Sequence, residues 1–421
     1  MAVLNALNGY SIDMSNVDYN RIDKGFYQWA AEDNVTFNGV TYPNVVEYDW
    51  TYEGNTYGSI FGGSFTTTTN EIGTPVPIAG TITGYVEQIW DGSSWFAIYQ
   101  LYHASVSATA VYDAILTPST SDDYGVQAQL YSEGDIITGS SYADTLYGYG
   151  GSDNLVGGGG NDTIDGGDGS FDVATYLYTD LSDILISKNK GGGYTTVTAN
   201  DGNDVLTNIE LLKTNIDGTE ASLSSLYDAQ TAPSFNYINN GVSTSATMTK
   251  YDGSVSWLDF YFYGANDRQT VSGTDFSEFF NLFGGIDAVD GRGGDDVLDG
   301  GTGSNFMTGG TGKDTFFIDG RGLTNTWSTI TDLTTNDTVT LWGWQNGTSQ
   351  LIETQENQGA SGFKGITYFY DLDGNGLQET KLTFTGLTAS DLNDPSVNTG
   401  AAVPHLSFSL ATSLGLQLTV I

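Results

Sequence analysis

Residues 139–165 read GSSYADTLY, GYGGSDNLV and GGGGNDTID, three consecutive copies of one nine-residue pattern. A looser copy, Leu130–Thr138, comes directly before them. An aspartate holds the sixth position of every copy, and an apolar residue follows two places later. These positions carry Asp135, Asp144, Asp153 and Asp162, followed by Ile137, Leu146, Leu155 and Ile164. Self-similarity at a short fixed period predicts a repeat architecture.

A second block of the same pattern lies about 120 residues later, with GRGGDDVLD at Gly291–Asp299 and GGTGKDTFF at Gly309–Phe317. Its sixth positions carry Glu278, Asp287, Asp296, Asn305 and Asp314, and its apolar positions carry Phe280, Val289, Leu298, Met307 and Phe316. In the first block the frame slips by one residue after Gly166, so the next acid is Asp172. Two blocks with at least four copies in register argue strongly against generic loops rich in glycine and aspartate.

The nonapeptide has a direct physical interpretation. Glycines permit positive φ and close backbone approach, so six residues can form a tight turn. The next three residues form a short strand whose middle side chain points inward. Two nonapeptides complete one coil of a flattened parallel β-helix, and stacked coils bury a ladder of apolar side chains. The glycines that we expect to frame the turns are Gly148, Gly150, Gly157, Gly159, Gly166, Gly291, Gly293, Gly300 and Gly309.

Aspartates and turn carbonyls would then line up along both edges of each stack. Carboxylates stacked without a cation repel one another. Calcium takes six to eight oxygen ligands in flexible geometry, so it would neutralise them and clamp adjacent turns. The pattern therefore predicts calcium as the cofactor, with the sixth-position residues of both blocks and the framing glycines as metal-site residues.

These blocks resemble the repeats of RTX (repeats-in-toxin) proteins, which are calcium-binding β-rolls exported by type I secretion. The resemblance covers about a fifth of the chain. It implies calcium held between turns, an uncleaved C-terminal export signal and folding outside the cell. The chain departs from the family pattern at Glu278, at Asn305 and at the slip before Asp172, and its outermost copies are poor in glycine. We therefore expect those edge turns to bind calcium weakly or not at all.

A separate metal-site candidate lies near the C-terminus. Its oxygen ligands at positions 1, 3, 5 and 9 are Asp371, Asp373, Asn375 and Glu379. This spacing resembles the calcium loops of EF-hand and dockerin motifs. It departs from them at the twelfth position, where Leu382 stands in place of the bidentate glutamate. The alternative is a plain turn rich in aspartate and glycine.

Composition supports a calcium ligand and excludes other classes. The chain has 421 residues, with 12 Lys and Arg against 51 Asp and Glu, and a formal charge of −39. A phosphate-backbone binder needs clustered basic residues, so nucleic acid is excluded as a partner. The absence of cysteine rules out disulfides, zinc thiolates and thiol nucleophiles. The only histidines are His103 and His405, which lie too far apart in the sequence for the common two-histidine metal motifs on one helix.

The expected fold class is all-β, with two calcium-binding parallel β-rolls flanked by β-rich N-terminal and C-terminal domains. Two helices are expected in the N-terminal domain, at Ser105–Leu116 and at Ser119–Ser132 with Ser121 as its N-cap. The segments are 1–129 (N-terminal domain), 130–175 (first β-roll), 176–272 (β-rich linker domain), 273–317 (second β-roll), 318–395 (C-terminal β domain) and 396–421 (C-terminal tail). The apolar, uncharged tail is either a terminal strand or an export signal.

The leading functional hypothesis is a secreted structural or interaction protein of the surface-layer, matrix or adhesin type. Such a protein would be extracellular or on the cell surface, pass through type I export machinery, and contact itself, the cell surface or a polysaccharide. No apolar run is long enough to span a membrane as a helix, and the start of the chain does not resemble an ordinary secretory signal peptide.

Two alternatives remain open. One is an extracellular enzyme that degrades polysaccharides with a pair of carboxylates. No spacing singles out such a pair, and His103 is the obvious general-base candidate, although a structural histidine is the simpler interpretation. The other is a carbohydrate-binding module, which exposed side chains at Trp95, Trp257 or Trp342 would favour. A protein without enzymatic activity is therefore our first expectation, and an enzyme is the alternative.

Overall fold

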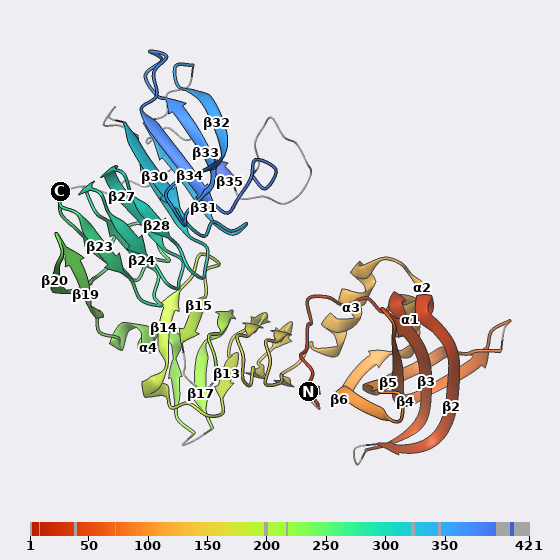
Figure 1. Cartoon of the computed structure of the whole chain (residues 1–421). Coiled ribbons are helices and arrows are strands. Elements are labelled where there is room, and N and C mark those ends of the chain that lie inside the picture. The colour runs from red at the N-terminus through yellow and green to blue at the C-terminus, as the bar shows by residue number, and fades with distance from the viewer. Residues whose placement is uncertain are drawn as a thin grey trace. The chain divides into compact units, whose positions relative to one another are not determined.

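The computed structural model describes residues 2–7, 9–37, 40–71, 73–197, 201–215, 218–320, 325–343, 347–392 and 405–407. The chain divides into two compact units, described separately below (Figure 1). Unit 1 contains Met1–Leu185 and Gly193–Ala229, and unit 2 contains Ile186–Gly192 and Gln230–Ile421. The predicted all-β fold with two parallel β-rolls is confirmed, with one β-roll in each unit.

Unit 1 begins with a strongly curved antiparallel sheet of long strands (Figure 1). The strands are β2 (Phe26–Phe37), β3 (Val40–Tyr52), β4 (Asn55–Thr69), β5 (Pro75–Trp90) and β6 (Trp95–Ser107). The pairings Phe37↔Val40 and Trp90↔Trp95 close two hairpins of this sheet. In the second hairpin Asp91 Oδ1 accepts hydrogen bonds from the backbone N–H groups of Ser93 and Ser94 at 2.7 and 2.8 Å.

Three helices lie beside this sheet: α1 (Asn20–Gly25), α2 (Ala108–Leu116) and α3 (Thr120–Leu130). Both predicted helices therefore exist, as α2 and α3. The predicted N-cap Ser121 is wrong, because Ser119 Oγ accepts a hydrogen bond from the Ser121 N–H and caps the helix instead. Ser119 has the extended backbone that an N-cap requires, whereas Ser121 is already inside the first turn.

The first β-roll follows α3 and stacks short parallel strands in two facing sheets. The inward ladder of one sheet contains Ile137, Leu155, Ala174 and Leu212, and that of the other contains Leu146, Ile164 and Leu206. All seven side chains are at most 1% exposed. The strands are β7 (Ile136–Thr138), β8 (Thr145–Tyr147), β9 (Gly150–Gly151), β10 (Asn154–Val156), β11 (Thr163–Asp165), β12 (Asp168–Gly169), β13 (Val173–Tyr176), β15 (Tyr194–Val197), β16 (Val205–Thr207), β17 (Leu211–Thr214) and β18 (Glu220–Ser222), followed by α4 (Leu223–Ala229).

The N-terminal residues close the open end of this roll. Strand β1 (Val3–Ala6) pairs in parallel with β7 and antiparallel with β6, so one 11-stranded sheet runs from β18 to β2. Leu4 continues the inward ladder above Ile137. On the other face Asp13 forms a parallel bridge with Thr145. The segment thus acts as an extra coil that pairs an otherwise open strand edge.

Unit 2 is built around the second β-roll, whose two ladders extend beyond residues 273–317 in both directions. One inward ladder contains Phe262, Phe280, Leu298, Phe316 and Val339, and the other contains Val271, Val289, Met307, Ile330 and Phe384. Aromatic rings therefore fill much of this core. Residues Phe260–Tyr263 form β22, the first rung of one ladder, although Tyr263 is exposed.

The parallel ladder of the nine-stranded sheet merges with antiparallel strands at both ends, and that of the eight-stranded sheet does so at one end. The sheets have the orders β20-β19-β23-β26-β28-β30-β34-β33-β32 and β21-β22-β24-β27-β29-β31-β35. Their strands are β19 (Ser234–Asn239), β20 (Val242–Thr247), β21 (Thr249–Lys250), β22 (Phe260–Tyr263), β23 (Gln269–Ser272), β24 (Glu278–Asn281), β26 (Ala288–Asp290), β27 (Val297–Gly303), β28 (Phe306–Thr308), β29 (Thr315–Asp319), β30 (Thr326–Ile330), β31 (Thr338–Trp342), β32 (Gln350–Gln358), β33 (Gly365–Asp371), β34 (Thr380–Thr385) and β35 (His405–Ser407).

Two further predictions concern the C-terminal tail and membrane-spanning helices. Apart from β35, the tail proposed as a strand or export signal lies outside the described residues. Among the helices that the structure describes, none is long and apolar enough to cross a membrane.

Candidate metal centres

The sixth-position residues form hydrogen-bonded columns along the edges of both rolls. In the first roll Asp153 Oδ1 accepts the backbone N–H of Asp135 at 2.7 Å, and Asp162 Oδ1 accepts that of Asp144 at 2.8 Å. Asp172 repeats the contact with the Asp153 N–H at 2.8 Å, so the frame slip does not break the column. In the second roll the same contact links Gln269 to Asp287, Asp287 to Asn305, Glu278 to Asp296, and Asp296 to Asp314, at 2.7–3.0 Å. One carboxylate oxygen per turn therefore ties adjacent coils together.

The second carboxylate oxygen has no hydrogen-bond partner in six of these turns. These atoms are Oδ2 of Asp153, Asp162, Asp172, Asp287, Asp296 and Asp314, and all are buried. Burial removes the hydration of such an oxygen, and no hydrogen bond replaces it. This lowers the stability of the fold by about 1–3 kcal/mol, and by more for a charged group. Six such atoms, spread over the two columns of each roll, fit a ligand that the protein itself does not provide.

The first glycine of each turn leaves space beside that oxygen. A Cβ built on Gly148 would lie 2.4 Å from Asp153 Oδ2 and 2.4 Å from the Gly166 carbonyl oxygen of the next coil. A Cβ on Gly291 would lie 2.1 Å from Asp296 Oδ2 and 2.7 Å from the Gly309 carbonyl oxygen. A carboxylate oxygen and a carbonyl oxygen thus face one small space between coils, and only glycine leaves it open. Oxygen ligands of this kind suit a hard divalent cation.

Positive φ does not explain the nine glycines that we predicted to frame the turns. Positive φ falls on the second and fourth residues of the turns, as in Gly158 and Gly160 (φ 104° and 112°), and not on the first and third. The nine glycines predicted to frame the turns occupy those first and third positions. First-position glycines are required for space beside the carboxylate. Third-position glycines such as Gly150 and Gly159 have no neighbouring atom closer than 3.6 Å to a built Cβ.

Burial raises the pKa of these carboxyl groups, and neighbouring acids add to the effect. The pKa of Asp153 rises to about 7 through burial and the charges of Asp172 and Asp135. The pKa values of Asp162 and Asp314 also rise to about 7, and that of Asp287 to about 6, with burial as the largest cause. The backbone N–H bond to each group acts in the opposite direction. A cation between the coils would remove the repulsion that these shifts reflect.

Three predicted ligands differ from the rest, because their side chains already have hydrogen-bond partners within their own turn. Asp144 Oδ2 accepts from the Ser140 N–H at 2.6 Å and from its hydroxyl at 3.0 Å. Glu278 accepts from the N–H and hydroxyl of Thr274. The Asn305 amide donates to the Gly301 carbonyl oxygen at 3.2 Å, so a donor occupies the place of the second carboxylate oxygen.

The sequence contained a signal for the first two exceptions, because a hydroxyl residue follows the first residue of their turns.

The columns also contain three residues that we did not predict. Asp204 and Glu210 accept the N–H groups of Asp162 and Asp172, at 2.9 and 2.8 Å, and continue both columns of the first roll after an insertion. Asp337 accepts the Asp314 N–H at 2.9 Å and ends a column of the second roll. No glycine-rich turn marks these residues, so the repeat pattern alone could not reveal them.

A lysine occupies one edge of the second roll. Lys190, from the segment Ile186–Gly192 of unit 2, donates from Nζ to the Lys313 carbonyl oxygen and to Thr315 Oγ1 at 2.9 Å. Its backbone N–H donates to Asp295 Oδ2 at 2.6 Å, and its ammonium group lies 5.7 Å from the centre of the Trp257 ring. This segment thus places a fixed positive charge against the acidic edge.

The β33–β34 hairpin carries the separate candidate loop. Carboxylate oxygens of Asp371, Asp373 and Glu379 lie within 4.8 Å of one another, the only metal-ligand cluster of this kind among the described residues. Asp371 accepts from the N–H groups of Gly374 and Gly376 at 2.7 and 2.8 Å, and Glu379 Oε2 accepts the Leu372 N–H at 2.8 Å. Asn375 Oδ1 accepts the Leu377 N–H at 2.7 Å, so it acts within the turn. Three of the four predicted residues are therefore brought together.

The residues that the alternatives depend on are placed differently. His103 is exposed, has a positive φ of 59°, and contacts the neighbouring Tyr102 ring edge-on. Trp95, Trp257 and Trp342 are half-buried: Trp95 packs on Trp90, and Trp342 packs on Phe317. These tryptophans thus do not form the exposed platform that a carbohydrate-binding module would favour.

The match to a protein-family model agrees with the geometry. The family model of the RTX calcium-binding nonapeptide repeat matches four copies, at residues 132–164 and 283–316. No curated protein matches the chain. Among solved structures, an extracellular lipase (LipA) of Serratia marcescens is similar, with 14% identity over 63% of this chain and 38% of the lipase, and a TM-score of 0.23. The chain thus spans less than two fifths of the lipase's length. The chain carries RTX repeats, and calcium is their ligand.

Proposed function

We propose that this RTX-repeat chain is a secreted structural or interaction protein, of the surface-layer, matrix or adhesin type, whose β-rolls fold on calcium outside the cell. The observation that carries the proposal is the set of six buried carboxylate oxygens without a partner. Each lies in a turn whose other carboxylate oxygen already holds a neighbouring coil. The carboxylates are thereby committed to the frame of the molecule, which suits a structural role.

The metal ligands that we propose are the second carboxylate oxygens of Asp153, Asp162, Asp172, Asp287, Asp296 and Asp314, with turn carbonyls such as those of Gly166 and Gly309. A further ion would lie in the β33–β34 loop, held by Asp371, Asp373 and Glu379. We propose no ion for the turns of Asp144, Glu278 and Asn305, because their side-chain atoms already have partners within the turn.

Calcium would act as a folding switch in this proposal. Ions that bind only the folded chain stabilise it in proportion to the logarithm of their concentration. At low calcium inside a cell, the acidic columns would repel and keep the repeats loose for export. At about millimolar calcium outside, the same columns would close.

The direct test is a calcium titration of the full chain, followed by circular dichroism and thermal unfolding. We expect a large gain of β signal and a rise in Tm on adding calcium, reversed by EGTA. The variant Asp162→Asn should weaken the calcium response, because it removes a free carboxylate oxygen but retains an acceptor for the Asp144 N–H. The control Asp113→Asn removes an exposed helical charge and should behave like the wild type.

A calcium-independent spectrum and Tm would refute the switch. An unchanged calcium response in Asp162→Asn would refute the assignment of this turn. Hydrolysis of a polysaccharide panel by the calcium-loaded chain would instead favour the enzymatic alternative.

A further inference from the structure

The N-terminal part of unit 1 contains a cavity that no repeat carboxylate lines. Its volume is about 350 Å³, within the range typical of small-ligand pockets, about 300–1,000 Å³. The cavity lies between one face of the β3–β6 sheet and the segment that contains α1. Its lining is mostly apolar and includes the rings of Trp50, Tyr57, Phe61, Tyr85 and Tyr99.

Strand register explains why these rings share a face. Trp50 pairs with Tyr57, Phe61 pairs with Tyr85, and Glu87 pairs with Tyr99, and directly paired residues project from the same side of a sheet. The Trp50 and Tyr57 rings stack with centres 4.7 Å apart, and the Phe61 and Tyr85 rings lie at the same distance but tilted by 44°. Four adjacent strands thus hold the aromatic wall rigidly.

A single buried carboxyl group stands on this wall. Glu87 lines the cavity yet is only 6% exposed. Its Oε2 accepts hydrogen bonds from the Tyr85 hydroxyl and from Ser59 Oγ, the latter at 2.7 Å, and Ser59 Oγ in turn accepts from Trp50 Nε1 at 3.0 Å. The described residues offer no hydrogen-bond partner to Oε1. Donors on the protein thus fix the orientation of the group and leave one oxygen available.

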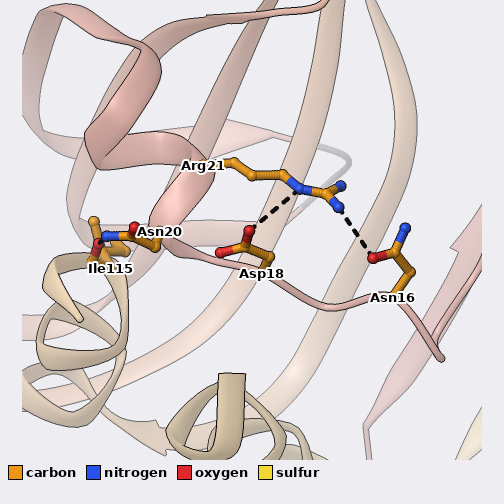
Figure 2. A network of polar contacts seen from close by, with 5 residues as sticks. All are labelled: Asn16, Asp18, Asn20, Arg21 and Ile115. Carbon is orange, nitrogen blue, oxygen red and sulfur yellow. Dashed lines mark hydrogen bonds and ion pairs between the residues drawn. The ribbon is translucent and has the colours of Figure 1, made fainter. Parts of the chain in front are cut away.

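Acidic groups dominate the charges at the rim. Asp13, Asp18 and Glu53 line the cavity together with one base, Arg21. Figure 2 shows that Arg21 is held by its own neighbours, with Nε 3.6 Å from Asp18 Oδ2 and Nη2 donating to Asn16 Oδ1 at 3.0 Å. Its guanidinium also lies 4.9 Å from the centre of the Tyr52 ring. The rim therefore favours the approach of a cation.

We propose that this cavity binds a small organic ammonium compound with an apolar body, whose ammonium group donates to Glu87 Oε1 while the aromatic rings surround the rest. Aromatic faces attract cations, most strongly where the contact is desolvated. A buried carboxylate provides the matching charge. This site is separate from the calcium columns and does not rest on the proposed calcium function.

The test uses the full chain with calcium at pH 8 and three probes of similar shape. Burial raises the pKa of Glu87 to about 7, so pH 8 keeps this group mostly ionised. We expect 2-phenylethylamine to bind in isothermal titration calorimetry, 2-phenylethanol to bind at least tenfold more weakly, and 3-phenylpropanoate not to bind. Equal binding of the amine and the alcohol would overturn the proposal without any variant, as would no binding of the amine.

The variant Glu87→Gln keeps an acceptor for Ser59 and Tyr85 but removes the charge. It should reduce amine affinity at least tenfold and leave alcohol affinity unchanged. The matched control is Glu47→Gln, which alters a half-buried glutamate of β3 that does not line the cavity. This control should bind like the wild type. Unchanged amine affinity in Glu87→Gln would overturn the role of the carboxylate.

Discussion

At the scale of the residue, a single atom separates the turns of this protein into two kinds. Where the second carboxylate oxygen has no partner, as in Asp162, the turn fits a cation. Where a serine or threonine follows the first residue of the turn, as with Ser140, its N–H and hydroxyl satisfy that oxygen. Sequence identified all of these carboxylates but did not separate the two kinds, because the distinction depends on hydrogen bonds within one turn.

Asn305 allows a gain-of-site experiment. Asn305→Asp replaces the donor that faces the Gly301 carbonyl oxygen with a second carboxylate oxygen, while the first still accepts the Asp287 N–H. We expect one additional calcium ion per chain in equilibrium dialysis. Without calcium the variant should lose about 1–3 kcal/mol of stability, because two acceptors then face each other. Asn236→Asp adds the same charge at an exposed position and should leave the ion count unchanged. An unchanged count in Asn305→Asp would contradict the interpretation of these turns.

The buried carboxyl group of Glu87 should make the stability of the fold depend on pH. Burial raises the pKa of Glu87 from 4.5 to about 7, so the folded state binds its proton more tightly than the unfolded chain. The resulting stability is present below the unfolded pKa and is lost as pH rises through about 7. Glu87→Gln should match the wild type at pH 5 and be more stable at pH 8, by at most about 3 kcal/mol. Urea unfolding at both pH values measures this difference. A constant difference between the two proteins would rule out titration of Glu87.

At the scale of the element, segments outside the repeats complete both rolls. Strand β1 pairs with β7 and places Leu4 on the first inward ladder. The segment Ile186–Gly192 contributes Lys190 to the edge of the second roll. Repeat periodicity located the stacked strands, but the partners of their exposed edges come from distant parts of the chain. Such pairings leave no periodic signal, so they could not be predicted from the sequence.

Lys190 makes this contribution measurable. Lys190→Met retains an apolar stem near Trp257 but removes the charge and the hydrogen bonds to Lys313 and Thr315. We expect a loss of about 1–3 kcal/mol in urea unfolding, greater in EGTA than in calcium, because calcium screens the same acidic edge. Lys364→Met, at an exposed position of unit 2, should have little effect. Equal stability of Lys190→Met and wild type in EGTA would show that this ammonium group does not support the roll.

At the scale of the whole molecule, bound calcium would neutralise part of the acidic charge. Six ions between coils and one in the β33–β34 loop would carry 14 positive charges and reduce the formal charge from −39 to about −25. Among the described strands, the 11-stranded sheet of unit 1 ends at β18 and β2, and the two sheets of unit 2 end at β20 and β32 and at β21 and β35. Such edges expose unpaired backbone groups that can pair with another chain.

The surface-layer form of the proposed function predicts calcium-dependent assembly. Lower self-repulsion and rigid rolls should allow chains to associate through these edges once calcium binds. We expect ordered sheets or filaments in negative-stain microscopy with calcium, and dispersed particles in EGTA. Magnesium at the same concentration is the control, because its strict octahedral geometry suits these turns poorly. A strict monomer under all three conditions would contradict the array and leave a monomeric binding protein.

The sequence by itself determined the repeat architecture, the all-β class, the inward ladders and calcium as the ligand. It could do so because each of these depends on local spacing: a glycine turn, an acid and an apolar residue recur every nine positions. Only the tertiary structure decided which turns have a free oxygen, which distant segments close the rolls, and that Glu87 stands on an aromatic wall. The free oxygens depend on hydrogen bonds that form only within each folded turn. The other two features depend on contacts between residues far apart in the chain, which leave no periodic signal in the sequence.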